Sequence, residues 1–200
     1  MKRIFAFILL FAMLVVGLSM FTGCSKSKSK SFKSDYPIDD FFDMINNEDN
    51  YTITYKETSN GTTNTYKVEF TKNRVKYTEN DDDPFFVEFK GKKTYVYKRG
   101  YSTWIKQEDD EGYFEMYFAE IKKEFKKKIS KMNSSSFEYD EKEECYKSKG
   151  DNTKIKFKEE SVYIKSSEKS LWSTSEFEII FKKIGGTKIT LPKAKKVDWD

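Results

Sequence analysis

Hydrophobic and polar residues alternate along most of the chain after residue 50. In segments 51–56 and 66–71 an aromatic or aliphatic residue occupies every second position, with a polar residue between. This alternation is typical of β-strands that bury one face and expose the other. The same pattern predicts strands at 75–77, 85–89, 95–97, 101–105, 137–139, 145–148, 155–157, 162–164, 177–181 and 189–191. Most breaks between them are short, which favours antiparallel hairpins.

Two segments follow a helical period instead. Apolar residues recur at three- and four-residue spacing in 37–45 and again in 111–132. Asp39 and Asp40 follow Pro37, a placement that suits a helix N-terminus. The second segment gathers acidic residues near its start and lysines near its end, which complements the helix macrodipole. We predict two amphipathic helices. The second also suits a membrane surface, but the six preceding one-faced strands offer a nearer apolar surface.

These elements follow the order helix, six strands, helix, and five or six strands. We therefore predict the α+β class, with about 11 strands in a single large antiparallel sheet. Neighbouring strands twist relative to one another by roughly 20–25°, so a sheet of this size curls or closes. We expect a half-barrel, with the N-terminal helix and the inserted amphipathic helix on its concave face.

The first 24 residues have the composition of an export signal. Lys2 and Arg3 precede an apolar run over residues 4–21, which is followed by small residues and then Cys24. A cationic start, an apolar stretch and a small-residue cleavage point are typical of a signal peptide. The alternative is an uncleaved membrane helix, because the apolar run has about 18 residues, the lower limit for spanning a bilayer.

The last four residues of this segment, FTGC, resemble the lipobox of bacterial lipoproteins. That pattern usually has Leu where this chain has Phe21. The resemblance implies cleavage between Gly23 and Cys24, with the Cys24 sulfur carrying a diacylglyceryl anchor on the extracytoplasmic side of the cell membrane. We expect a signal peptide at 1–23, a lipidated and flexible Ser/Lys tether at 24–35 and one globular domain at 36–200.

Charge is distributed unevenly between these regions. The whole chain has a formal charge of +4, of which residues 1–35 carry +5 and residues 36–200 carry −1. A nearly neutral domain argues against nucleic acid as a partner, because a phosphate backbone requires a concentrated basic surface. The four tether lysines suit anionic lipid head groups, although the acyl anchor dominates membrane attachment. The protein partner cannot be identified from the sequence.

The sequence lacks the usual residues of a catalytic or metal site. It has no His and no phosphate-binding glycine motif. Asp81, Asp82 and Asp83 fail the spacing of a calcium loop and suit a solvated hairpin tip better. Asp109 and Asp110 suit a helix cap better than acid–base catalysis. We expect no enzyme activity, no cofactor and no metal. Cys145 is left without a disulfide partner, and a buried structural side chain is favoured over a redox role.

Tyrosine and phenylalanine are unusually frequent, with 13 Tyr and 18 Phe. Tyr combines an apolar ring with a hydroxyl group, which suits a cavity wall that meets a lipid head group. The alternative is a core that the helices fill completely. The predicted cavity lining is Tyr51, Tyr55, Tyr66, Phe70, Tyr77, Tyr95, Tyr97, Phe114, Phe118, Ile121 and Phe125.

The order of elements, with the lipoprotein signal and the closing segment TKITLP, resembles the lipoprotein-carrier superfamily of the LolA and LolB type. The resemblance covers nearly all of residues 36–192 and implies an unclosed barrel whose cavity takes acyl chains. We therefore expect a membrane-anchored envelope lipoprotein that binds or carries a lipid or another apolar ligand. The alternative is an envelope scaffold or accessory subunit that acts through protein contacts.

Overall fold

The computed structural model describes residues 38–129, 134–158, 161–169 and 174–197. The predicted signal peptide, the lipidation site at Cys24 and the tether lie outside the described residues. Described helices are α2 (Ile38–Asn47), α3 (Tyr113–Ile129) and the short 3-10 helix η2 (Ser134–Ser136). The strands are β1 (Tyr51–Ser59), β2 (Thr62–Phe70), β3 (Arg74–Glu79), β4 (Phe85–Lys90), β5 (Lys93–Arg99), β6 (Trp104–Glu108), β7 (Phe137–Asp140), β8 (Cys145–Ser148), β9 (Lys154–Lys158), β10 (Ser161–Lys169), β11 (Thr174–Lys182) and β12 (Ala194–Lys196).

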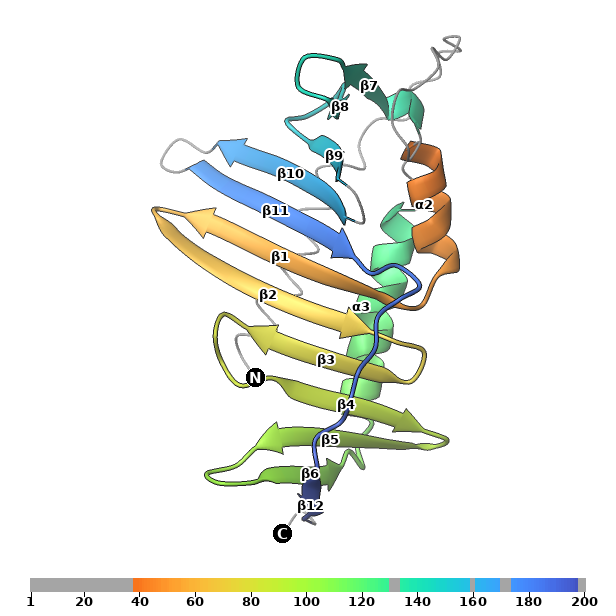
Figure 1. Ribbon diagram of the computed structural model, residues 1–200, viewed down its shortest axis with the longest axis vertical. Helices are drawn as coiled ribbons and strands as arrows, with labels where there is room; N and C mark the ends of the chain where they lie inside the picture. The colour runs from red at the N-terminus through yellow and green to blue at the C-terminus, as the bar shows by residue number, and fades with distance from the viewer. Residues whose placement is uncertain (1–37, 130–133, 159–160, 170–173, 198–200) are drawn as a thin grey trace.

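The 12 strands of the described residues form one sheet, in the order β12-β6-β5-β4-β3-β2-β1-β11-β10-β9-β8-β7. Strand β1 pairs with β11 and so joins the strands before α3 to those after it. The strands at the two ends, β12 and β7, do not pair with each other, so the sheet is open. Figure 1 shows the sheet twisting along the long axis of the molecule. The predicted α+β class and single large sheet are confirmed.

A tight turn sets the register of the first hairpin. Asn60 and Gly61, between β1 and β2, have φ angles of 52° and 78°. Positive φ at both central residues is the turn geometry that matches the right-handed twist of two paired strands. Gly tolerates this conformation because it has no Cβ atom, and Asn is one of the few other residues that adopts it. The resulting register places Tyr55 opposite Tyr66.

Both α-helices lie on one face of the sheet, which we call the inner face (Figure 1). The ring of Phe41 in α2 packs 5.4 Å from that of Phe181 in β11. The ring of Phe118 in α3 packs 6.5 Å from Phe70 in β2 and 6.2 Å from Phe85 in β4. Large aromatic side chains therefore bridge the helices and the sheet, and the buried residues between them form one continuous hydrophobic cluster.

Residues 187–193, which we call the C-terminal strap, cross the opposite, outer face of the sheet (Figure 1, dark blue). Thr187 Oγ1 lies 3.0 Å from Thr52 Oγ1, and Arg74 Nη1 donates a hydrogen bond of 3.1 Å to the Ile189 carbonyl. The strand predicted at 189–191 is wrong. The strap runs across the strands and cannot share their ladder, so regular pairing begins only at β12, which is parallel to β6.

Candidate functional site

Most of the predicted cavity-lining residues gather on the inner face. Tyr51, Tyr55, Phe70, Tyr77 and Phe118 are buried in the main hydrophobic cluster, and Tyr66 and Phe114 are half-buried against it. The rings of Tyr66, Tyr55 and Phe177 form a stacked row across β2, β1 and β11, with centroid distances of 6.0 and 6.3 Å. The side chains of Ile121 and Phe125 lie outside the described part of the structure.

Tyr95 and Tyr97 were predicted on the same face, and this prediction is wrong. They lie with Phe86 and Trp104 in a second cluster on the outer face, where Ile189 of the strap covers them. In β5 the inward residue is Val96, which pairs with Val87 of β4 in the main cluster. Apolar residues occupy both faces of β5 because the strap buries the outer one, so simple alternation could not identify the inner face.

Polar contacts fasten α3 at two points along its length. At its start, the Phe114 amide donates a hydrogen bond of 2.7 Å to Asp109 Oδ2, and Thr94 Oγ1 donates one of 3.2 Å to Glu115 Oε2. Further along, Lys122 and Lys126 place their Nζ atoms 2.9 and 3.0 Å from Asp49 Oδ1. We call this three-residue contact the Asp49 latch. Hydrogen bonds from the two lysines lower the pKa of the Asp49 carboxyl group.

Buried phenol groups lie within the apolar layer between α3 and the sheet. Burial raises the pKa of Tyr51 and Tyr117 well above the ordinary value for a phenol. Burial also raises the pKa of Tyr77, and the neighbouring Glu79 carboxylate adds to this effect. These phenols therefore stay protonated at neutral pH.

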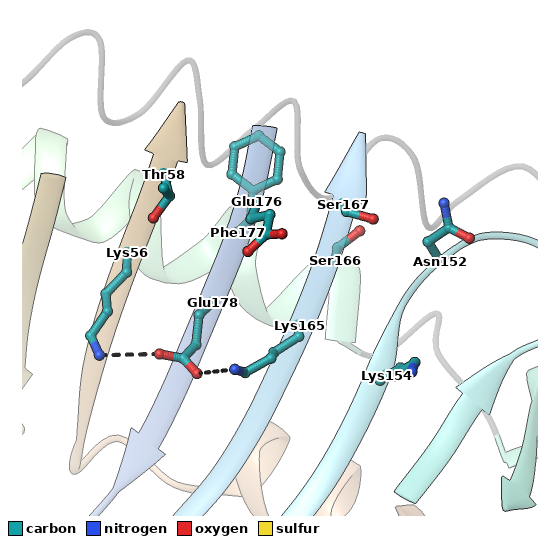
Figure 2. A pocket seen from close by; sticks show the side chains of 10 residues that line it. All are labelled: Lys56, Thr58, Asn152, Lys154, Lys165, Ser166, Ser167, Glu176, Phe177 and Glu178. Atoms are coloured by element: carbon teal, nitrogen blue, oxygen red, sulfur yellow. Dashed lines mark ion pairs between the residues drawn. The ribbon is translucent and has the colours of Figure 1, made fainter. Parts of the chain in front are cut away.

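A pocket of about 380 Å³ lies on the outer face across β1, β11, β10 and the start of β9 (Figure 2). Glu178 is at its centre and forms ion pairs with Lys56, at 3.1 Å, and with Lys165, at 3.0 Å. The three residues are direct neighbours in the ladder. The lining is completed by Thr58, Asn152, Lys154, Ser166, Ser167, Glu176 and Phe177.

Opposing effects act on the central carboxylate of this pocket. Partial burial acts to raise the pKa of Glu178, but hydrogen bonds from Lys165 and Lys56 outweigh it and the pKa is lowered. Glu178 is therefore ionised and holds both ammonium groups in place. Sequence reasoning missed this site. The alternation of polar residues in each strand is visible, but the pairing of β1 with β11 that brings the charges together is not.

The structure places the other groups weighed in the sequence at a turn, at a helix start and in a strand. Asp81, Asp82 and Asp83 are exposed at the turn between β3 and β4, and Asp109 caps the start of α3. Cys145 is buried in β8, and burial raises the pKa of its thiol. Within the described ranges, no group of three or more acidic or cysteine side chains is arranged to hold a metal ion.

No protein-family model matches the sequence, and no curated protein matches it either. Among the described residues, no helix has the length and apolar character required to cross a membrane.

Proposed function

We propose that this protein is an envelope lipoprotein, anchored through Cys24 on the extracytoplasmic side of the cell membrane, that binds an apolar ligand between α3 and the inner face of the sheet. The ligand class is an acyl chain or a molecule of similar shape. The charged outer positions of the strands and the apolar inner layer support this assignment, since an apolar ligand gains most of its binding free energy from burial.

The observation that carries the proposal is how α3 contacts the sheet. In its first half, α3 reaches β2 and β4 through the rings of Phe114 and Phe118, with ring centroids 5.8 to 6.5 Å from their partners. The Asp49 latch then holds its second half through side chains at the surface. An apolar chain inserted between the rings of α3 and those of the sheet would exchange ring–ring contacts for ring–ligand contacts. Little apolar surface would become exposed to water in this exchange.

Exchange of such a ligand requires α3 to move. Ion pairs between partly exposed side chains contribute only about 0.2–1 kcal/mol each, so the Asp49 latch opens far more easily than the core unfolds. A helix that swings from the sheet would therefore act as a lid.

Ligand binding is tested by extracting the purified full-length chain with organic solvent and identifying the released lipids by mass spectrometry. Acyl groups of the anchor are covalently attached and stay with the protein, so only a bound ligand is released. We expect about one lipid per chain, with several-fold less in Phe114→Ala and no change in Met116→Ala, which alters an exposed residue of the same helix. A wild-type chain that releases no more lipid than an unrelated lipoprotein would contradict the proposal.

Anchoring is tested separately with Cys24→Ser. The variant should retain the signal peptide and incorporate no labelled fatty acid, because the sulfur that accepts the diacylglyceryl group is missing. Cells that express Ser25→Ala provide the matched control, which should remain membrane-bound and be processed normally. Cleavage of the signal peptide from Cys24→Ser, or incorporation of labelled fatty acid into it at the wild-type level, would exclude the lipid anchor at Cys24.

A further inference from the structure

The outer-face pocket is a polar site in which neither positive nor negative charge dominates. We propose that it binds a small uncharged saccharide. The site is separate from the inner-face layer, because Lys56, Lys165 and Glu178 occupy the outward positions of their strands. The proposal therefore stands or falls independently of the apolar ligand under α3.

Charge balance argues for an uncharged ligand. Glu178 pairs with both Lys56 and Lys165, and Lys154 forms its own ion pair of 2.6 Å with Glu143 outside the pocket lining. Glu176, exposed on the same face of β11, adds a carboxylate. A free anion would meet two carboxylates and a free cation would meet three lysines, whereas an uncharged ligand meets neither repulsion.

The hydrogen-bonding groups match a molecule that carries many hydroxyls. An ammonium group has three N–H donors, so Lys56 and Lys165 each keep donors beyond the one that reaches Glu178. Their side chains are 41% and 65% exposed and can turn toward a ligand. Sugar hydroxyls accept from such donors and donate to carboxylates such as Glu176. Hydrogen bonds with one ionised partner are roughly twice as strong as neutral ones.

The remaining lining provides shorter polar groups at the sides. Hydroxyls come from Thr58 of β1 and from Ser167 of β10, and Asn152 contributes an amide from the loop before β9 (Figure 2). The volume of about 380 Å³ is near the lower end of ligand pockets, which span about 300–1,000 Å³. This size suits one or two sugar rings rather than a long chain.

The test measures binding of glucose, N-acetylglucosamine and their disaccharides to the full-length chain by saturation-transfer NMR, in a detergent without a sugar head group. We expect at least one of these probes to bind, with about tenfold weaker affinity in Lys165→Met and in Glu178→Gln, because each loses charge-assisted hydrogen bonds. The matched control is Lys182→Met. Lys182 is exposed on the outer face of β11, four residues or about 13 Å from Glu178.

Charge selectivity gives a second readout that a structural role for these residues would not move. Glucuronate should bind more weakly than glucose to the wild-type chain, and Glu176→Gln should reverse that order by removing one carboxylate. Unchanged thermal unfolding of each variant would show that the fold is intact. The proposal is overturned if none of the probes binds, if Lys165→Met binds as well as Lys182→Met does, or if glucuronate binds the wild type more tightly than glucose.

Discussion

Phe118 and Met116 are two residues apart on α3 and have opposite environments. Phe118 is 2% exposed and contacts the rings of Phe70 and Phe85, whereas Met116 is 64% exposed. We predict that Phe118→Ala lowers the free energy of unfolding by about 3–5 kcal/mol, since it removes a buried ring and leaves a cavity. Met116→Ala should change it by less than about 0.5 kcal/mol. Urea unfolding of both variants measures the difference, and equal effects would show that α3 does not pack as described.

Asp109 and Asp110 are neighbours in sequence, but only Asp109 caps α3 through the Phe114 amide. Removing the acceptor leaves a helix N-terminal N–H group without its side-chain partner. We predict that Asp109→Ala lowers the free energy of unfolding by about 1 kcal/mol. Asp110→Ala, which removes the same charge from an exposed position, should have a much smaller effect. The measurement is urea unfolding by circular dichroism, and an equally large loss in Asp110→Ala would assign the effect to charge rather than to capping.

At the scale of elements, the Asp49 latch connects α3 to the loop between α2 and β1. Asp49→Asn removes the charge that meets Lys122 and Lys126, so we predict faster amide hydrogen exchange in the second half of α3. The expected loss of stability is about 0.5–1 kcal/mol, because Asp49 is partly exposed and the ion pairs are screened. Asp43→Asn, on the exposed side of α2, is the control. Exchange in α3 that is unchanged by Asp49→Asn would exclude the latch.

The same contact predicts a pH dependence. The pKa of Asp49 is lowered in the folded chain, so its stabilising contribution is present above the unfolded value of about 4 and is lost as pH falls through the lower, folded value. The difference in stability between wild type and Asp49→Asn should therefore shrink below about pH 4. Urea titrations at neutral and acidic pH measure it, and a difference that grows on acidification would show that the latch is not electrostatic.

Element by element, the sequence predicted local structure better than it predicted which face each strand presents. Alternation identified β1 and β2 and their inward tyrosines because the outer face of these strands is mostly polar. It failed in β5, where Tyr95, Val96 and Tyr97 are all at least half-buried. The strap also alternates, through Ile189 and Leu191, and so was predicted as a strand. The apolar period of a segment indicates which of its residues are buried. It does not indicate whether the segment is a strand of the sheet or a strap that crosses it.

At the scale of the whole molecule, the two candidate sites lie on opposite faces of one sheet, and long-range pairing creates both. Strand β1 joins β2 on one side and β11 on the other, which continues the row of inward rings and also assembles Lys56, Glu178 and Lys165. The charged row on the outer face forms only because β1 pairs with β11, a strand more than 100 residues away in sequence. No local sequence pattern specifies this pairing. The inner layer could be predicted from the sequence, because the alternation within each hairpin identifies its own inward residues.

The C-terminal strap covers the second cluster on the outer face, and its contribution to stability can be tested. Ile189 is 7% exposed and covers Phe86 and Tyr97, while the neighbouring Lys188 is exposed. Ile189→Ala should lower the free energy of unfolding by about 2 kcal/mol or more, because it removes buried aliphatic surface from a small cluster that has little other cover. Lys188→Ala should change it by less than about 0.5 kcal/mol. The measurement is urea unfolding followed by tryptophan fluorescence, since Trp104 lies in the same cluster. Should both variants unfold at the wild-type urea concentration, the strap would contribute nothing to the stability of the outer face, and the burial of Tyr95 and Tyr97 would need another cause.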